Sequence, residues 1–376
     1  MEAALLGIRR GLVMRYQLDW FDHFGNKKGV IQAFSGLEYV KTLNAIGSLV
    51  VDIPRGLYQY DQFAVGDILE IWRAKNDTLE LQNEAAYFLQ NWQFTTDPGG
   101  EEFIRLTAFD ANWLLDTAIV YAAAGSADAS MTGYPDNLMK AIVNKQLGAT
   151  ATAGRGKLTV APDLSAGGAS VTKAFAYRNV LNVLAELAAQ AGEGGTFLAF
   201  DTVRTQVATF EFRTYTGQRG INHSRTSGDP RLVGKQYGNL SEATFGTFHA
   251  AERNYIYVGG QGEEAARVIV ERSNATRIGA SKWNRREMFM DARQQELTAS
   301  LNAEGDGALD EFKPKKVLTG RLRDTPGMQY GVHYGFGDIL SAEAFGYHVD
   351  CHVASVRVSF NQDTGEQIDI RLRGEM

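Results

Sequence analysis

Two β-hairpin patterns, each preceded by the same four residues, constrain the fold of this chain more than any other feature. The phrase Gly-Asp-Ile-Leu occurs at 66–69 and again at 337–340. One repeated tetrapeptide is expected by chance in a long chain, so the longer pattern after each copy is the informative part. Apolar and polar residues alternate on both sides of a polar turn in Trp92–Ala108 and in Val356–Leu372. This alternation predicts two hairpins with one buried face each, and therefore two related, mostly antiparallel β modules.

The duplication makes a prediction that a structure can test. The turns of the two hairpins fall at Asp97–Gly100 and at Asn361–Gly365. If the repeat is real, Gly66 and Gly337 lie at equivalent tight bends, where a Cβ would obstruct the backbone. The two hairpins should then also correspond to each other.

Length and pattern together predict three parts. At 376 residues the chain exceeds what one hydrophobic core usually serves. Strand patterns dominate residues 14–118 and 226–376, which we assign to the first and second β modules. Residues 119–225 combine helical and strand patterns, which predicts a small α+β domain. A helical insertion at about 284–312 interrupts the second module, so the fold class is β-rich α+β.

Three helices are predicted from apolar stripes with a 3.6-residue period. The first begins at Pro135 and Asp136 and ends at Gly148. The second follows Val180 and is expected to stop at Gly192. The third, within the insertion, is expected from Asp291 to Ala303, with Leu297 and Leu301 on one face. A further expectation is that Val268–Val270 forms a strand beside Tyr255–Val258.

Composition excludes several protein classes. The chain is 44% hydrophobic and 22% charged, which is ordinary for a globular protein. Its formal charge of −6 argues against a dedicated nucleic-acid binder. Cys351 is the only cysteine, so an intramolecular disulfide or a cysteine-built zinc site is excluded. Glu2 within Met1–Arg10 is unlike a secretory leader, and no window reaches the ~20 apolar residues of a membrane span. We expect no membrane association and a reducing cytoplasm during assembly.

The densest set of potential metal ligands is His348, Asp350 and His352, which surround Cys351. On a strand the three ligands would share a face. They would also be spread over about 13 Å, which is too far for all three to reach one tetrahedral ion easily. We therefore predict an ordinary polar strand face and no metal site.

Two glycine-rich stretches and one histidine motif are further candidates for ligand sites. Gly154–Lys157 resembles the end of a phosphate-binding loop, but Ala151 and Leu158 stand where a glycine and a hydroxyl are needed. Gly259–Gly262 follows a predicted strand, yet no long helix or downstream acid completes a dinucleotide-binding unit. His249–Arg253 lacks the second histidine of a zinc protease. We predict a turn between strands at Gly259–Gly262, and no cofactor.

No catalytic residue is predicted. No serine lies in a nucleophile-elbow setting. The 44 acidic residues permit some carboxylate pair of the kind that glycoside hydrolysis uses, but no pair stands out. Trp20, Trp113 and Trp283 are expected as core or interface anchors rather than as sugar-binding platforms.

Short motifs spread over most of the chain carry a family resemblance through their order. These stretches are Gly47–Pro54, Val65–Ile71, Asp110–Leu115, Phe212–Ser224, Gly238–Leu240, Tyr257–Gly262 and Phe336–Leu340. The chain resembles the tail hub proteins of tailed bacteriophages, most closely the hubs of long, non-contractile tails. The resemblance extends to contractile baseplate hubs, the phage late-control D family and the hub part of type VI secretion spikes. An aspartate–arginine pair expected near Gly217–Gly220 is not present in that form, and no fused lysozyme, peptidase or needle segment follows the second module.

The resemblance implies a structural virion protein at the tail tip or baseplate, and not an enzyme. It implies a homotrimer with two tube-type antiparallel β-barrels per subunit, so that three subunits present six barrels to a six-fold tail tube. The implied partners are the tail tube or distal tail protein, the tape measure protein and three-fold fibre or spike proteins, with DNA passing through unbound. Two barrels in one chain convert three-fold into pseudo-six-fold symmetry, which accounts for the duplication. The first alternative is a tail-associated peptidoglycan hydrolase. The second is a carbohydrate-binding β protein, and this second alternative would leave the two modules unexplained.

Overall fold

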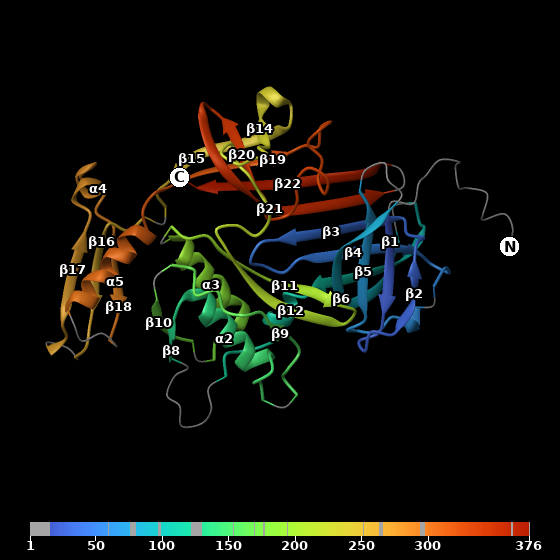
Figure 1. Cartoon of the computed structure of the whole chain (residues 1–376), viewed down its shortest axis with the longest axis horizontal. Coiled ribbons are helices and arrows are strands. Elements are labelled where there is room, and N and C mark those ends of the chain that lie inside the picture. Colours follow the sequence, from blue (N-terminus) through green and yellow to red (C-terminus); the bar gives the residue numbers. More distant parts are fainter. Residues whose placement is uncertain are drawn as a thin grey trace.

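The computed structural model of the chain is β-rich, with short helices on one side of a long sheet (Figure 1). It describes residues 16–375 apart from 59, 76–79, 97–98, 122–129, 153, 169, 176, 194, 251, 263–265, 294–297 and 362–363. The segment Met1–Arg10 lies outside the described residues. None of the helices within the described part is long and apolar enough to cross a membrane.

The elements follow in chain order. The first β region holds β1 (Tyr16–Phe21), β2 (Lys27–Ile31), β3 (Gly36–Thr42), β4 (Ser48–Pro54), a 3-10 turn η1 (Tyr60–Gln62), β5 (Ile68–Ala74), β6 (Leu81–Thr96) and β7 (Glu102–Asp110). The middle part holds α1 (Trp113–Asp116), β8 (Ser130–Gly133), α2 (Pro135–Leu147), β9 (Thr159–Val160), β10 (Val171–Ala174), α3 (Val180–Glu193), β11 (Leu198–Gln206) and β12 (Thr209–Thr216). The rest holds β13 (Asn222–His223), β14 (Leu232–Gly234), η2 (Lys235–Tyr237), β15 (Leu240–Phe248), β16 (Tyr255–Gly259), β17 (Ile269–Ser273), α4 (Ala275–Gly279), β18 (Glu287–Asp291), α5 (Thr298–Glu311), β19 (Lys315–Leu322), β20 (Ile339–Ala344), β21 (Tyr347–Asn361) and β22 (Gly365–Glu375).

One 14-stranded sheet contains the first and the last described strands, β1 and β22. Its order is β15-β19-β22-β21-β3-β4-β7-β6-β5-β1-β2, and β20 branches from β21 with β13 and β14 beside it. The two β regions meet where β21 pairs antiparallel with β3, from Ser355↔Thr42 to Asn361↔Gly36. A single cluster of buried apolar residues extends across both regions, from Leu18 to Leu372. The predicted β-rich fold with antiparallel pairing is confirmed.

The two β regions share a strand plan, which we call the first region (β1–β7) and the second region (β13–β15 and β19–β22). Strands β4, β7, β6 and β5 adjoin in the same order as β19, β22, β21 and β20. A bulge interrupts each hairpin at the same place, after Leu89↔Ala108 in β6–β7 and after Val353↔Leu372 in β21–β22. The predicted hairpins Trp92–Ala108 and Val356–Leu372 therefore correspond, because both begin and end at matching positions of the register.

The repeated glycines occupy equivalent bends, as predicted. Gly66 and Gly337 have φ angles of 88° and 86°, a region that favours glycine. Gly66 N donates to Leu89 O over 2.9 Å, and Gly337 N donates to Val353 O over 3.1 Å. The return bonds, to Asp67 O and to Asp338 O, are both 2.8 Å long. The duplication is thus a property of the backbone and not a coincidence of four letters.

The aspartate after each glycine closes the bend. Asp67 Oδ2 accepts from Ala64 N over 3.1 Å, and Asp338 Oδ2 accepts from Gly335 N over 2.5 Å. The same side chains hold different second partners. Asp67 accepts from the indole Nε1 of Trp20 over 2.8 Å, which places that tryptophan in the core.

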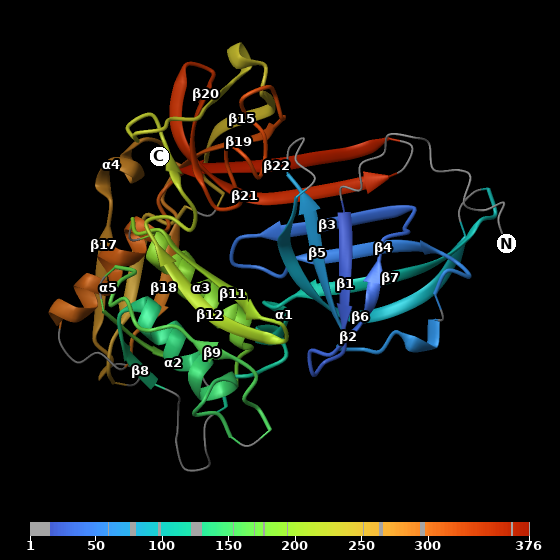
Figure 2. The same ribbon diagram turned by 45° about the vertical axis from the view of Figure 1, so that its right-hand side comes forward.

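The middle part packs two helices against a three-stranded sheet of order β11-β12-β9 (Figure 2). Its core joins Leu138 and Met139 of α2, Leu184 and Leu187 of α3, and Phe212 of β12. Helix α2 matches its prediction. Helix α3 continues through Glu193, so Gly192 lies in the last turn and does not stop the helix as predicted.

A separate unit is inserted between β15 and β19, and lies at the left of Figure 1. Its sheet has the order β17-β16-β18, and α5 covers one face of this sheet. Leu301 of α5 lies in one apolar cluster with Ile256 and Val258 of β16. The stretch 284–312 lies within this unit together with β16 and β17. The first region has no such insertion, because the short segment 43–47 joins β3 directly to β4.

The helix of the inserted unit differs from its prediction. The apolar pattern predicts a helix from Asp291 to Ala303, but α5 spans Thr298–Glu311. Asp291 instead ends β18, where it pairs with Gly259 of β16. Leu297 lies outside the described residues, and Leu301 is buried as expected. The strand predicted at Val268–Val270 is present beside β16 as β17, but it spans Ile269–Ser273.

Candidate functional site

The three predicted metal-ligand candidates share strand β21 but have separate partners. His348 Nδ1 lies 3.4 Å from Glu343 Oε2 and 3.2 Å from Arg225 Nη2. Asp350 accepts from the hydroxyl of Ser341, and the ring of His352 stacks on Phe197 at 4.0 Å between centroids. Burial lowers the pKa of His352 to about 4. Among the described residues, no three His, Cys, Asp or Glu side chains are grouped closely enough to hold a metal ion.

The other candidate motifs form local contacts. Arg155 donates to Ile119 O over 2.9 Å, and Lys157 Nζ lies 3.2 Å from Thr117 Oγ1, so both cations of the glycine-rich stretch at 154–157 bind their own surroundings. Gly259 ends β16, and Gly260 N donates to Val268 O over 2.8 Å. The stretch 259–262 is therefore the start of a hairpin connection, as predicted. Its residues 263–265 are outside the described part.

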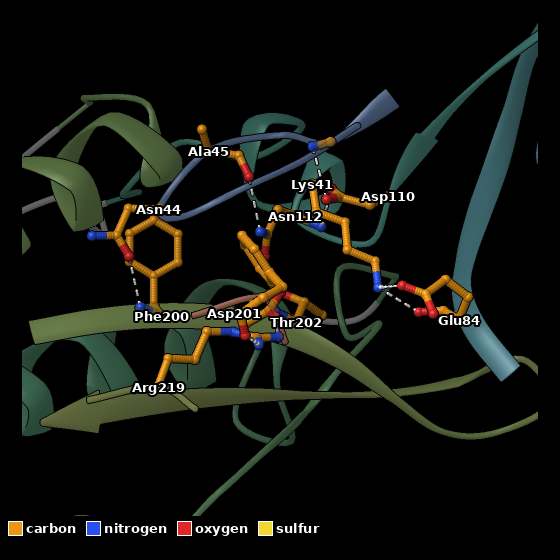
Figure 3. Close-up of polar contacts among 12 residues, drawn as sticks. Lys41, Asn44, Ala45, Glu84, Asp110, Asn112, Phe200, Asp201, Thr202 and Arg219 are labelled. Carbon is orange, nitrogen blue, oxygen red and sulfur yellow. Dashed lines mark hydrogen bonds and ion pairs between the residues drawn. The ribbon is translucent and has the colours of Figure 1, made fainter. Parts of the chain in front are cut away.

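A polar cavity of about 360 Å³ lies where the first region, the middle part and the second region meet. We call it the junction cavity. Its polar lining comes from all three: Lys41, Lys75, Glu84 and Asp110 from the first region, Asp201, Arg204 and Arg219 from the middle part, and Tyr330 from the segment before β20. Figure 3 shows Lys41 directed toward Glu84 and Arg219 directed toward Asp201. The junction cavity is the strongest candidate functional site of the described chain, because charged groups converge there from distant elements.

Glu84 is the centre of the first-region side of the junction cavity. Its Oε1 lies 2.7 Å from Lys41 Nζ and accepts from the hydroxyl of Tyr330 over 2.9 Å. Its Oε2 lies 3.4 Å from Lys75 Nζ. Burial opposes the charged form, but the two lysines outweigh it and lower the pKa of Glu84 to about 2. Glu84 is therefore ionised at neutral pH and holds both lysines.

Asp110 occupies the end of β7 and faces the middle part. Its Oδ2 accepts from Gly47 N over 2.7 Å, and its Oδ1 accepts from Asn112 N over 3.1 Å. A Cβ at Gly47 would lie 2.5 Å from that Oδ2, so the contact requires glycine. Burial, and then the negative charge of Asp201, raise the pKa of Asp110 to about 8. The carboxyl group is therefore mostly protonated at neutral pH.

Two asparagines fasten the first region to β11 beside this cavity (Figure 3). Asn44 Oδ1 accepts from Phe200 N over 2.8 Å. Asn112 Oδ1 accepts from Thr202 N over 2.8 Å, and its Nδ2 donates to Ala45 O over 3.0 Å. Each amide thus joins backbones that are far apart in sequence, and the two contacts fix the position of the middle part against the sheet.

The aspartate–arginine pair that the sequence lacked near 217–220 is assembled by the fold. Arg219 Nη2 pairs with Asp201 of β11, and its Nη1 donates to Phe336 O over 3.1 Å. The guanidinium also lies 4.5 Å from the centroid of the Phe336 ring. Burial disfavours this cation, yet the charge of Asp201 raises the pKa of Arg219. The pair thereby connects the middle part to the bend that precedes β20.

The junction cavity is built to hold three parts of the chain together. Its carboxyl groups are occupied by lysines, an arginine and backbone N–H groups. The two carboxyl groups that most resemble a catalytic acid–base pair are Asp110 and Asp201. Asp110, however, already accepts a hydrogen bond from Gly47 N. Sequence reasoning included Asp110 in a motif but missed the Lys41–Glu84 pair, because these two residues lie 43 positions apart and leave no local pattern.

Comparison with protein families decides the class of this chain. A model of the family described as "Siphovirus ReqiPepy6 Gp37-like protein" matches residues 20–372. The chain belongs to this siphovirus family. Among curated proteins no match is found. The prediction of a tailed-bacteriophage tail protein is confirmed, and this Gp37-like chain is a component of the phage tail.

Solved structures agree with the family. The prophage tail protein gp18 from Listeria monocytogenes has a TM-score of 0.54 and 12% identity, over 96% of this chain and 94% of that one. The tail protein from Neisseria meningitidis has a TM-score of 0.54 and 11% identity, over 96% of both chains. The 43 kDa tail protein of prophage MuSo2 from Shewanella oneidensis has a TM-score of 0.56 and 11% identity, over 95% and 98%. At these identities the likeness shows a shared fold.

Proposed function

We propose that this tail protein is a homotrimeric hub at the distal end of the phage tail. The observation that carries the proposal is the backbone duplication: two regions with the same strand order, the same bulge and the same glycine bend lie in one chain. Three copies then present six similar surfaces, which fits a six-fold tail tube on one side. The three-fold arrangement of the copies fits three-fold fibre or spike proteins on the other.

The domain division is part of the same proposal. Residues 14–118 and 226–376 form two tube-type antiparallel β-barrel modules around the ring, and residues 119–225 form the α+β domain that braces them. The junction cavity supports this division, because Lys41–Glu84, Asp110 and Arg219–Asp201 lie where all three parts meet. The hub would contact the tail tube or distal tail protein, the tape measure protein, and the fibre or spike proteins.

We also propose that the ring surrounds the DNA channel. The sheet face away from the core carries arginines that are already paired across strands. The pairs are Arg105–Asp52 at 2.7 Å, Arg321–Asp369 at 2.8 Å and Arg357–Glu38 at 2.6 Å. Each phosphate neutralised by a cation adds affinity for DNA, so carboxylates that occupy these arginines would let DNA pass without being retained.

The ring can be tested by mass and by shape. Light scattering of the purified protein should give about three times 41.3 kDa. Negative-stain images should show a three-fold ring with a central hole. Since a hub can need its neighbours to close, the same measurement is repeated with the tail tube protein. A chain that stays monomeric in both and is absent from purified tails would refute the trimeric hub.

The enzymatic alternative can be tested directly on the junction cavity. A structural hub should leave a peptidoglycan zymogram uncleared. Clearing by the pure protein that is abolished by Asp110→Asn or Asp201→Asn would assign hydrolysis to this cavity and overturn the structural proposal. Clearing that survives both changes would point to a contaminating enzyme or to another site. A mock purification run on the same zymogram distinguishes these two cases, because a contaminating enzyme would also clear there.

A further inference from the structure

The junction cavity contains buried polar groups that the described fold leaves without a partner. The side chain of Tyr87 lines the cavity and is 0% exposed, and its hydroxyl has no hydrogen-bond partner in the described part of the chain. The same holds for Oγ1 of Thr202 and for Nε of Arg219, although both Nη groups of that arginine are bound. Buried polar groups in folded proteins are nearly always paired. Three such groups around one cavity therefore indicate that it is built for an occupant.

The Tyr87 hydroxyl lies on the charged side of the junction cavity. Its pKa is raised first by burial and then by the negative charges of nearby acids. Those acids are Asp110, Glu84 and Asp201, and all three line the cavity. Since a charge acts on a buried group mainly over a short distance, the phenol oxygen points toward the cavity and not into the apolar core.

The junction cavity is open on the side of its cations and enclosed at its floor. The side chains of Lys41, Lys75 and Arg219 are 18%, 21% and 20% exposed, so solvent reaches them. Glu84, by contrast, is 3% exposed, and Tyr87 is fully buried. A small molecule that enters from solvent therefore passes the cations before it reaches the tyrosine hydroxyl. With a volume of about 360 Å³, the cavity is near the lower end of the range for small-molecule sites.

Cations outnumber ionised acids in the lining. The cations come from the first region and the middle part: Lys41, Lys75, Arg204 and Arg219. Of the three acids, Asp110 is mostly protonated at neutral pH, which leaves Glu84 and Asp201. Arg204 is balanced by Glu70 beside the cavity. The lining therefore repels a metal cation and attracts an anion.

We propose that the junction cavity binds a small oxyanion, a molecule with a carboxylate or phosphate group. Its oxygen atoms accept from the Tyr87 hydroxyl, from Nε of Arg219 and from the lysine ammonium groups. Charge-assisted hydrogen bonds of this kind are the strong ones. A ligand held by β6 and by the segment after β12 joins the first region to the middle part, and it thereby stiffens their contact. The site lies within a single chain and does not depend on the trimer.

Calorimetric titration of the dialysed full chain measures the binding. The probes are inorganic phosphate and succinate, which distinguish a phosphate from a carboxylate ligand, with sodium chloride at equal ionic strength as the reference. We expect one or both probes to bind at one equivalent per chain and to raise the unfolding temperature. Low millimolar concentrations keep this effect apart from the general stabilisation by excluded salts. Absence of binding by both probes would overturn the oxyanion site.

Tyr87→Phe removes the unpartnered hydroxyl and keeps the ring. Because that hydroxyl has no described partner, the unfolding temperature of the anion-free chain should stay the same or rise slightly. The affinity for the probe should fall about tenfold, since one hydrogen bond to a charged group is lost. An undiminished affinity would contradict a site at Tyr87.

Tyr39→Phe is the matched control. Tyr39 belongs to the same apolar cluster as Tyr87, and its hydroxyl is likewise buried without a described partner, but it lies outside the described lining of the cavity. Its affinity for the probe should equal that of the wild type. An equal loss of affinity in both variants would show an indirect effect of the core and would overturn the site.

Hydrogen–deuterium exchange locates the site independently of any substitution. Binding should slow amide exchange at Gly47, Asn112 and Thr202, whose N–H groups form the contacts beside the cavity. The inserted unit, with Tyr255–Gly259 as its central strand, should not change and serves as the internal reference. Slower exchange confined to the inserted unit, or no change in either place despite calorimetric binding, would put the anion elsewhere and refute the proposal.

Discussion

The two β regions share a backbone plan and differ in the segments that join its strands. The first region connects β3 to β4 through 43–47, whereas the second places a folded unit between the corresponding strands β15 and β19. The unit has its own sheet and its own apolar cluster around Ile256 and Leu301. A hairpin tip can carry such a unit because the ladder on either side sets the register without it. The difference teaches that the shared part of the duplication is the ladder and its bends.

The same bend is also anchored differently in the two regions. Asp67 accepts from the indole of Trp20 and lies 2.9 Å from Lys28 Nζ. Asp338 accepts from Ile221 N over 2.6 Å, and its Oδ2 lies 3.7 Å from His223 Nε2. In both cases Oδ2 closes the bend. The Oδ2 atom of Asp67 also binds Trp20 and Lys28, whereas Asp338 uses its Oδ1 to accept from Ile221 N. The hydrogen bond that closes the bend is therefore common to both regions, whereas the other partners of each aspartate are specific to its own region.

The largest difference in stability between matched substitutions in the two regions is expected at the junction cavity. Ala85 of β6 and Val349 of β21 occupy corresponding positions in the two regions. Glu84 and His348 directly precede them and therefore correspond to each other. Glu84→Gln removes the buried carboxylate that Lys41 and Lys75 share, so we expect a loss of about 3 kcal/mol in unfolding free energy. His348→Gln, at a side chain that is 52% exposed, should cost no more than about 0.5 kcal/mol. Urea unfolding of the two variants measures both; equal losses would show that the cavity adds nothing to stability.

The second prediction concerns pH. The pKa of Asp110 is about 8 in the folded chain, well above its unfolded value near 3.8. Between these values the folded state keeps a proton that the unfolded state has released. Stability should therefore fall as pH rises from about 4 to 8, by up to about 1.4 kcal/mol per pH unit from this group. Asp110→Asn should remove that slope in urea titrations at pH 5, 6, 7 and 8.

The control for the pH series is Asp61→Asn, at an exposed carboxylate in η1. It should leave the slope unchanged. If Asp110→Asn also leaves the slope unchanged, the carboxyl group titrates normally and the enclosed environment described for it is wrong. In the second region, the position that corresponds to Asp110 is occupied by Gly374, so that region has no acid there.

The third prediction tests whether the two bends are equivalent in energy. Asp67→Ala and Asp338→Ala each leave partly buried N–H groups without an acceptor, and each should cost about 2–3 kcal/mol. Asp67→Ala should be the more costly by a few tenths, since it also leaves the Trp20 indole unpaired. Thermal and urea unfolding of both variants checks this. A near-neutral Asp338→Ala would limit the equivalence to backbone geometry.

The smallest effect is expected from removing the inserted unit. Replacing 249–314 by the segment 43–47 of the first region should change the stability of the large sheet by less than about 1 kcal/mol. The reason is that the unit buries its own core and the ladder between β15 and β19 stays intact. Circular dichroism and the urea midpoint measure the outcome. Collapse of the sheet would show that the insertion is part of the second region and not an addition to it.

Much of the ladder could be predicted from sequence, since a hairpin brings together residues close in the chain. The strands of both hairpins, the bends at Gly66 and Gly337 and helix α2 are encoded in local alternation, turn residues and apolar period. The end of α3 and the position of α5 could not be predicted as well. In the inserted unit, the pairing of β18 with β16 uses Asp291, which a helical stripe alone assigns to the helix.

The sequence by itself determined the strands of both hairpins and the glycine bends of two related β regions, because side-chain alternation and turn chemistry act over a few residues. Tertiary structure alone decided how the two β regions join through β3 and β21, whose paired residues are more than 300 positions apart. It also decided the partners of Glu84 and Asp110, and it supplied Asp201 to Arg219. Such contacts depend on how registers and layers place separate strands, and no local pattern encodes that distance. The charges of the junction cavity therefore acquire their meaning only in the folded chain.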